Sequence, residues 1–277
     1  MFTISPLRYP GGKTKLYNKV SKIITENGLQ GCTYVEPFVG GAGLAIKLLD
    51  NNIVDNLIIN DYDYHIYSFW YCVIHHCNEL IALISSTPIT LAEREIQKNI
   101  FNNIDKYSVL EVAFSTLFLN RTNRSGVLKA GPIGGQKQNG KYLLDCRFSK
   151  EKIIEKILHI AQFKDNIELF NLNAVDFIEI INRNNGQLFV NFDPPYYNKG
   201  AELYTNFFVD EDHIQLKNSI DNVNHPWITT YDYCEFIENL YQEYRHEIIT
   251  LSYSAGKSKK GHELLFYSND LRIPNNQ

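Results

Sequence analysis

The stretch TYVEPFVGGAGLAIKLLDNNIVDNLIIND, residues 33–61, alternates between strand-like and helix-like patterns. Residues 33–38 predict a short strand, residues 39–43 a glycine-rich loop, and residues 44–51 a helix with apolar residues at i, i+4 spacing. Residues 57–59 predict a second strand, which ends in Asn60 and Asp61. Strand, glycine turn, helix and strand in this order form the βαβ unit of a parallel sheet.

Downstream of this unit the pattern changes twice. Residues 65–85, 91–102 and 109–119 predict helices, and no strand pattern follows before residues 167–170. Strand patterns return at residues 188–192 and 227–230, and residues 247–251 and 263–267 predict a closing hairpin. The sequence therefore predicts an α/β domain formed by residues 1–63 and 151–277, with a mostly helical insertion over residues 64–150.

Composition limits the class of protein. The chain has 277 residues, of which 44% are apolar, enough for one large domain or a core with a smaller lobe. Five cysteines without a CxxC pair indicate reduced thiols in a cytosol-like compartment. The first residues lack a signal-peptide pattern, and no apolar run approaches the ~18 residues that span a bilayer. We expect a soluble, cytoplasmic protein without membrane contact.

Charge is unevenly distributed along the chain. The formal net charge is −4, which argues against a uniformly basic coat for nucleic acid. Between Arg121 and Lys150, however, seven basic residues accompany the single acid Asp145, and five glycines interrupt the segment. A flexible basic face suits a polyanion such as DNA, although a solvated loop with incidental lysines has the same composition.

The glycine loop and the acid that ends the second strand indicate a ligand. The loop Gly40-Gly41-Ala42-Gly43 lets backbone approach a ligand closely, but it is not the GxGxxG of dinucleotide sites. Asp61 follows Gly43 by about eighteen residues, where nucleotide-binding α/β folds carry a carboxylate for the ribose diol. This pair predicts an adenosine-bearing ligand, with a tight turn and a helix-capping aspartate as the alternative.

The run NFDPPYY, residues 191–197, follows the apolar residues 188–190. Pro194 and Pro195 fix two φ angles and remove two N–H donors, while Asp193 adds a carboxylate, so the turn offers acceptors. Their natural partner is an amine with two hydrogens on a planar base, for which Tyr196 provides a stacking face. The alternative is a Pro-Pro turn packed by tyrosines.

Four motifs resemble those of one family. Residues 193–196 match the DPPY motif of amino-methyltransferases that act on nucleic acid, and LRYPGGK, residues 7–13, resembles their N-terminal aromatic-x-GGK element. EPFVGGAG, residues 36–43, resembles their glycine-rich loop, and FLNRTNRSG, residues 118–126, their recognition segment. In this order, and with Glu263-Leu264-Leu265 in the last hairpin, they resemble the DNA adenine methylase (Dam-like) family over nearly the whole chain.

The resemblance implies an S-adenosylmethionine-dependent DNA N6-adenine methyltransferase, with a Rossmann-like methyltransferase sheet and a target-recognition domain at residues 64–150. It implies double-stranded DNA as partner, S-adenosyl-L-homocysteine as product and no metal. The implied cofactor contacts are Tyr9, Lys13, Phe38, Gly40, Gly41, Asp61 and Asp193. The implied catalytic residues are Asp193, Pro194 and Tyr196. The DNA contacts, from the recognition segment and the basic stretch after it, are Asn120, Arg121, Arg124, Lys129 and Lys137.

Two departures from the family pattern bear on these expectations. Tyr9 stands where the family often has Trp, which keeps an aromatic face but changes its size. Residues 122–125 differ from the pattern of GATC-methylating members, which leaves the recognised DNA sequence open. Phage, housekeeping and restriction–modification contexts stay open too, with a cognate restriction endonuclease as a further candidate partner.

The implied mechanism extrudes adenine from the duplex, stacks it on Tyr196 and lets Asp193 and the Pro194 carbonyl accept its amine hydrogens. N4-cytosine methylation and RNA methylation are rivals within the enzyme class. Family members that act on cytosine more often carry Ser at the position of Asp193, which favours adenine here. A non-catalytic DNA-binding regulator is a rival from another class, but its mark would be a broken DPPY motif or glycine loop, and both are intact.

Overall fold

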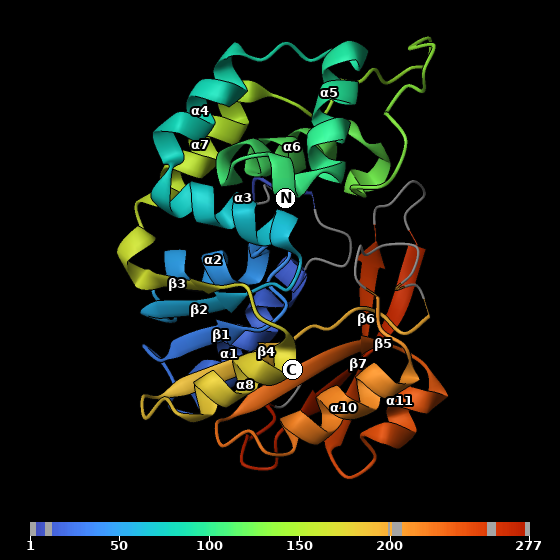
Figure 1. The fold of residues 1–277 in the computed structure, drawn as a ribbon. Helices are drawn as coiled ribbons and strands as arrows, with labels where there is room; N and C mark the ends of the chain where they lie inside the picture. The colour runs from blue at the N-terminus through green and yellow to red at the C-terminus, as the bar shows by residue number, and fades with distance from the viewer. Residues whose placement is uncertain (1–3, 9–12, 199, 201–206, 254–258, 275–277) are drawn as a thin grey trace. The chain divides into compact units, whose positions relative to one another are not determined.

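The computed structural model describes residues 4–8, 13–198, 200, 207–253 and 259–274 (Figure 1). The chain divides into two compact units. We call Met1–Pro10 with Asp63–Leu169 the helical unit, and Gly11–Tyr62 with Phe170–Gln277 the sheet unit. Each unit is therefore assembled from segments that are separated in the sequence.

One sheet contains seven strands among the described residues. The strands are β1 (Thr33–Glu36), β2 (Asn56–Asn60), β3 (Ile167–Phe170), β4 (Leu188–Phe192), β5 (Trp227–Asp232), β6 (Arg245–Tyr253) and β7 (Lys259–Tyr267). Their order is β3-β2-β1-β4-β5-β7-β6. The predicted α/β fold with a Rossmann-like sheet is confirmed.

The centre of the sheet is parallel. β1 pairs with β2 and β4, so that Val35 lies opposite both Ile58 and Val190, and β4 pairs with β5 in the same sense. β1 ends at Glu36 because Pro37 has no N–H to continue the ladder. The predicted βαβ unit of residues 33–61 is confirmed, with each element within one or two residues of its expected ends.

The last two strands are antiparallel. β7 lies between β5 and β6 and runs against both, which confirms the predicted closing hairpin. Because β7 pairs with β5 along five residues, from Tyr267 opposite Ile228 to Glu263 opposite Asp232, its side chains are held against the parallel part of the sheet. The turn of this hairpin, with Lys257 and Ser258, lies outside the described residues.

Helices cover both faces of the sheet. They are η1 (Lys13–Leu16), α1 (Tyr17–Glu26), α2 (Gly43–Asp50), α8 (Ala174–Asn182), α10 (Asp210–Ile220) and α11 (Glu235–Leu240). In Figure 1, α8, α10 and α11 lie in front of the strands and α1 and α2 behind them. Phe177 of α8, Leu216 of α10 and Ile237 of α11 are buried in one cluster with Phe192 and Phe266 of the sheet.

The helical unit contains α3 (Tyr64–His75), α4 (Cys77–Ser86), α5 (Leu91–Asn102), η2 (Ile104–Lys106), α6 (Val109–Thr122), η3 (Arg124–Gly126), α7 (Lys150–Ala161) and η4 (Lys164–Asn166). α6 packs against α3, α4 and α5 and is nearly all buried. It begins at a capping box, in which Ser108 accepts from the Glu111 N–H and Glu111 accepts from the Ser108 N–H.

One helix prediction was wrong. Residues 65–85 form two helices, because the backbone of His76, with φ −129° and ψ 39°, leaves the helical region and starts α4 in a new direction. Apolar spacing continues across His76, so the pattern alone did not reveal the break. No helix among the described residues is long and apolar enough to cross a membrane.

Candidate active site

Three segments with polar side chains follow neighbouring parallel strands. Asp61 follows β2, the glycine loop follows β1, and Asp193 follows β4. Since the sheet order is β2-β1-β4, these segments share the carboxyl edge, with the glycine loop in the middle. Open α/β sheets bind ligands at this edge, where the chain connections diverge to opposite sides.

The glycine loop is joined to the end of β2. Gly40 has φ +44° and its N–H donates to Oδ2 of Asp61 at 2.8 Å. The Val39 N–H donates to the Asn60 carbonyl at 2.9 Å. The structure therefore brings together Gly40 and Asp61, two residues that the sequence singled out for one ligand. Phe38 is half-buried, and its ring meets that of Phe208 edge-on at 6.0 Å between centroids.

The turn after β4 is held by the neighbouring strand β5. Oδ1 of Asp193 accepts a hydrogen bond from the Thr230 hydroxyl at 3.0 Å. The carboxylate of Asp232 accepts from the backbone N–H groups of Tyr197 and Asn198, at 2.8 and 3.0 Å. Thr230 and Asp232 of β5 thus hold the chain on both sides of the Pro-Pro turn. The acceptor groups of the turn are therefore fixed in one position.

Lys13, Asp193, Tyr196 and Glu263 form a cluster, which we call the lysine cluster. Lys13 Nζ lies 2.7 Å from Oδ1 of Asp193, 3.1 Å from the Tyr196 hydroxyl and 3.5 Å from Oε2 of Glu263. The Tyr196 hydroxyl donates to Oε1 of Glu263 at 2.6 Å. Side-chain exposure is 3% for Lys13 and 0% for Glu263, but 23% for Asp193. Asp193 is thus the charged member that reaches solvent.

Burial and charge shift the titration of this cluster. Burial lowers the pKa of Lys13, but the carboxylates of Asp193 and Glu263 outweigh it and the pKa is raised. Burial raises the pKa of Asp193, an effect that Lys13 opposes and Glu263 reinforces. Next to it, burial raises the pKa of Glu36 to about 8, although hydrogen bonds from Tyr34 and Asn191 lower it.

The donors and acceptors at this edge define the ligand that fits. A diphosphate would meet like charges at Asp61 and Asp193, whereas a ligand with a positive centre and a sugar diol would meet acceptors. Backbone at the glycine loop permits close approach of a planar group. Among the described residues no three His, Cys, Asp or Glu side chains are grouped so as to hold a metal ion.

The predicted DNA contacts lie in the helical unit, and Asn120 among them is buried. Its Oδ1 accepts from the Arg8 N–H at 2.7 Å, and its Nδ2 donates to the carbonyls of Arg8 and Gly126, each at 2.9 Å. Gly126 has φ +79°, and a Cβ there would lie 2.2 Å from the Arg8 oxygen. Asn120 and Gly126 together hold the N-terminal segment against the loop that follows α6, which we call the recognition loop.

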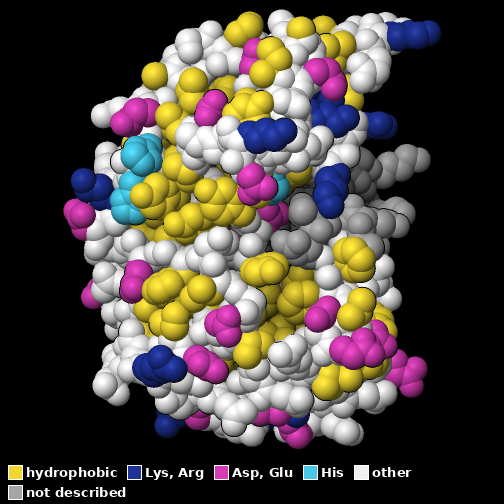
Figure 2. All heavy atoms as spheres, in the orientation of Figure 1, with side chains coloured by type: hydrophobic (Ala, Val, Ile, Leu, Met, Phe, Trp, Pro, Cys, Tyr) yellow, Lys and Arg dark blue, Asp and Glu magenta, His cyan; other side chains and the backbone are white. Residues whose placement is uncertain are grey.

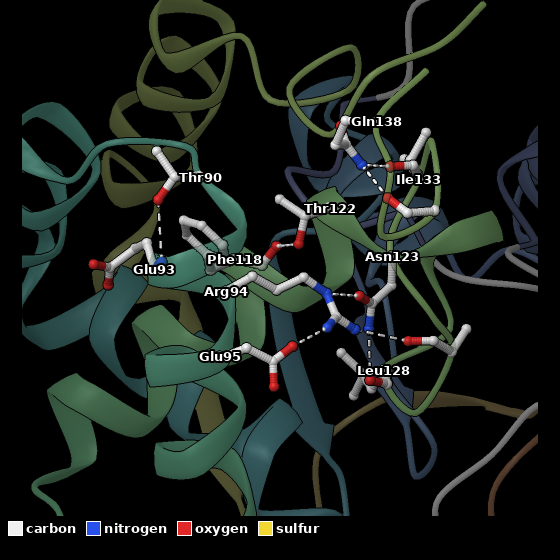
Figure 3. A network of polar contacts seen from close by, with 12 residues as sticks. Thr90, Glu93, Arg94, Glu95, Phe118, Thr122, Asn123, Leu128, Ile133 and Gln138 are labelled. Carbon is white, nitrogen blue, oxygen red and sulfur yellow. Dashed lines mark hydrogen bonds and ion pairs between the residues drawn. The ribbon is translucent and has the colours of Figure 1, made fainter. Parts of the chain in front are cut away.

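A second buried amide shapes the same loop (Figure 3). Arg94 of α5, 3% exposed, donates through Nε to Oδ1 of Asn123 at 2.9 Å and through Nη2 to the Ala130 carbonyl at 3.0 Å. Asn123 in turn donates to the carbonyls of Val127 and Leu128. The loop after α6 is therefore built around a buried arginine–asparagine pair, and its outer residues are left to solvent.

Arg124, Lys129 and Lys137 are exposed on this loop. Arg121 is half-buried, and burial lowers its pKa to about 10, helped by the positive charges of Arg8 and Arg147. Figure 2 shows Lys and Arg side chains over the helical unit and Asp and Glu side chains over α10 and α11. The local excess of basic residues between Arg121 and Lys150 therefore belongs to the unit that carries the recognition segment.

Some residues were missed or lie outside the described residues. Tyr9 is outside them. The sequence analysis assigned no role to Glu263 or Arg94, which form the buried ends of the two networks. An acid inside the apolar strand ELLFY, residues 263–267, was the available signal for Glu263, since buried carboxylates require partners. Arg94 lies in an ordinary amphipathic helix, and nothing in the sequence distinguished it.

The fold is an α/β sheet whose carboxyl edge carries the glycine loop, Asp61 and the turn after β4. The sequence matches the D12 class of N6 adenine-specific DNA methyltransferases over residues 9–254, and the chain belongs to that family. It is therefore a methyltransferase that acts on adenine N6 in DNA, and its family uses S-adenosylmethionine as methyl donor.

Individual relatives are more distant. The type II methyltransferase M.MjaIII of Methanocaldococcus jannaschii is 26% identical over 230 residues, which is 76% of each chain. A solved Pyrococcus horikoshii structure assigned as an RNA methyltransferase is 8% identical, with a TM-score of 0.45 over 95% of this chain and 85% of its own. The Escherichia coli protein yhhF, assigned as a methyltransferase, is 9% identical, with a TM-score of 0.32 over 92% and 83%.

Proposed function

We propose that the carboxyl edge of the sheet unit is the methyl-transfer site and that Asp193 receives the adenine amine. The observation that carries this proposal is the fixed carboxylate: Asp193 is held by Lys13 at 2.7 Å and Thr230 at 3.0 Å, yet 23% of its side chain is exposed. A carboxylate that is both held and accessible can accept a hydrogen bond from substrate without first reorganising.

S-adenosylmethionine, when bound, supplies an electrophilic methyl group on a sulfonium. We assign its binding to Phe38, Gly40, Gly41, Asp61 and Asp193, with Tyr9 and Lys13 from the N-terminal element. Asp61 suits the ribose diol because it ends β2 and is anchored to Gly40. Lys13 contributes through Asp193, whose carboxylate it orients.

The residues of the turn activate the amine. The N6 lone pair of adenine is delocalised into the ring, so the nitrogen is a poor nucleophile. Asp193 and the Pro194 carbonyl accept its two hydrogens and favour a more tetrahedral nitrogen, whose positive charge in the transition state the carboxylate stabilises. Tyr196 provides the stacking face for the base. Transfer by this route requires orientation and charge, and Asp193 need not remove the proton before the methyl group moves.

The helical unit supplies target recognition in this proposal. Arg121, Arg124, Lys129 and Lys137 face DNA, and Asn120 holds the loop that carries them. Adenine inside a duplex is out of reach, so the base is extruded into the site at a cost of a few kcal/mol. The concentration of basic residues between Arg121 and Lys150 supports this role.

The biological setting extends the same proposal. The type II designation of the Methanocaldococcus relative supports a restriction–modification role, with a cognate endonuclease as partner. The enzyme would then act in the cytoplasm, on the nucleoid. N4-cytosine or RNA methylation is the alternative activity.

The test is methyl transfer from labelled S-adenosylmethionine to unmethylated genomic DNA and to total RNA, followed by mapping of the modified base. We expect N6-methyladenine in one sequence context and no label in RNA; N4-methylcytosine or labelled RNA would support the alternative. Asp193→Ala should abolish transfer while thermal unfolding stays cooperative. The exposed Asp270→Ala is the control, and full activity of Asp193→Ala would refute the assignment.

A further inference from the structure

Glu263 of β7 is a fully buried carboxylate at the base of the lysine cluster. Its side chain is 0% exposed, and it accepts from the Tyr196 hydroxyl at 2.6 Å and lies 3.5 Å from Lys13 Nζ. Its backbone pairs with Asp232, the residue of β5 that holds the turn after β4. Glu263 is therefore a rigid point of attachment behind the site.

The hydrogen-bond polarity of the cluster is fixed by its chemistry. An ammonium group only donates, so the Tyr196 oxygen accepts from Lys13 and the phenolic hydrogen must go to Glu263. Lys13 directs its other donors to Asp193 and Glu263. Removal of any member leaves a buried donor or acceptor unpaired, which is why the arrangement has one low-energy form.

Glu263 also balances charge. Lys13 is almost completely buried, and it lies between two carboxylates, of which only Asp193 reaches solvent. A buried cation paired with Asp193 alone would draw that carboxylate inward with its full attraction. The second carboxylate repels that of Asp193 and offsets part of this attraction, so Asp193 keeps acceptor capacity for a substrate.

We propose that Glu263 is a positioning residue for methyl transfer, which fixes the Tyr196 ring directly and the Asp193 carboxylate through Lys13. The proposal rests on the proposed function of Asp193. Because Glu263 touches neither substrate nor cofactor, its removal should lower kcat more than it changes the affinity for S-adenosylmethionine.

The chain offers a matched control. Glu247 of β6 accepts a hydrogen bond from the Tyr267 hydroxyl and pairs with Lys19 at 2.6 Å. Like Glu263, it lies in the closing hairpin and contacts one tyrosine and one lysine, but its side chain is 21% exposed and Asp193 is not among its partners. Glu247→Gln therefore measures what loss of a Glu–Tyr–Lys contact in this hairpin does to the rate when Asp193 is not involved.

The experiment compares Glu263→Gln, Tyr196→Phe, the double variant and Glu247→Gln in single-turnover methylation of unmethylated genomic DNA. We expect Glu263→Gln to lower the rate about 10-fold or more, since small displacements at a reacting centre have effects of this size. Calorimetric affinity for S-adenosylmethionine should change less than about 3-fold, and Glu247→Gln should keep the wild-type rate. The double variant should be no slower than the slower single variant, because both substitutions break one linkage.

A pH profile separates positioning from simple loss of stability. The titratable groups that face Asp193 are Lys13 and Glu263, with Glu36 and Tyr34 behind them. The negative charge of Glu263 raises the pKa of Asp193, so its removal should move the acid limb of the rate profile to lower pH. Glu247→Gln should leave that limb in place.

The outcomes separate the two proposals. If Asp193→Ala is inactive but Glu263→Gln has the wild-type rate and acid limb, the positioning role is wrong and the function of Asp193 stands. If Asp193→Ala is active, the proposed function itself fails. Should Glu263→Gln not fold, Tyr196→Phe removes the donor of the same hydrogen bond. A wild-type rate of Tyr196→Phe would overturn the inference, and a rate about 10-fold lower would support it.

Discussion

The ammonium of Lys13 lies 2.7 Å from the carboxylate of Asp193, joining the start of η1 to the turn after β4. Sequence resemblance assigned Lys13 to the cofactor. In the structure, Lys13 contacts Asp193, Tyr196 and Glu263. The Lys13 side chain is only 3% exposed, so its positive charge acts mainly on the carboxylates next to it. This relationship makes Lys13 testable apart from cofactor binding.

Lys13→Met should lower stability by about 3–5 kcal/mol, because it leaves two carboxylates facing each other without a cation. Without the cation that lowers it, the repulsion from Glu263 raises the pKa of Asp193 further. A carboxyl group whose pKa is higher in the folded state loses stability as pH rises, so the variant should be relatively more stable at low pH. Thermal unfolding at pH 5.5 and pH 8, with the exposed Lys22→Met as control, checks this; equal losses at both values would contradict it.

Glu36→Gln should flatten the dependence of stability on pH. Burial raises the pKa of Glu36 to about 8, so the folded state holds a proton that the unfolded state has released between about pH 4.5 and 8. Wild-type stability should fall as pH rises through this window, by about 1.4 kcal/mol for each pKa unit that is realised. The amide keeps acceptor geometry without charge. Denaturant midpoints of the wild type and of Glu36→Gln at pH 5 and pH 8.5 test this. If the midpoint falls equally in both proteins between these pH values, Glu36 is not the source of the pH dependence.

Gly126→Ala should weaken DNA binding and leave S-adenosylmethionine binding unchanged. A Cβ at Gly126 would lie 2.2 Å from the Arg8 carbonyl, and the backbone has φ +79°, so the N-terminal segment must move off the recognition loop. Gly135 is the control, because it has φ +68° but nothing within 4 Å of its added Cβ. Strain from φ alone costs about 1–2 kcal/mol in both. Equal DNA affinities of the two variants would show that the contact with Arg8 is unimportant.

Arg94→Met should destabilise the helical unit by about 3 kcal/mol and reduce DNA affinity. The substitution keeps the apolar stem but leaves the buried oxygen atoms of Asn123 and Ala130 without their donor. Arg183→Met removes an exposed arginine, 78% accessible and paired with Glu179, and should change stability by less than about 0.5 kcal/mol. Thermal unfolding and duplex titration of both variants measure the difference.

Arg124→Ala distinguishes base reading from phosphate binding. Arg124 is exposed on the recognition loop, and an arginine that pairs with guanine contributes about 1–3 kcal/mol of discrimination. If Arg124 reads a base, the variant should lose affinity for the methylated sequence and little for a scrambled duplex. Equal losses on both duplexes, with a reduced dependence on salt, would indicate a phosphate contact.

Sequence patterns predicted the sheet well because its strands are short apolar runs bounded by residues that cannot extend them. Asp61 follows β2 as predicted, whereas β1 ends at Glu36, two residues before its predicted end, because Pro37 has no N–H to continue the ladder. The break at His76 was not readable, because apolar residues continue on both sides and only packing decided the change of direction. Helices α7, α8, α10 and α11 were not separately predicted, although their apolar faces complete both cores.

The sequence by itself determined the order of the strands along the chain, the positions of the glycine loop and the Asp-Pro-Pro-Tyr turn, and the excess of basic residues in one segment. These are local properties, set by backbone restriction, side-chain period and charge. Only the tertiary structure decided that Lys13, Tyr196 and Glu263 share one buried cluster and that Arg94 and Asn123 shape the recognition loop. Such pairs are far apart in the chain, and they form because a buried charge or amide must find partners wherever the fold brings them.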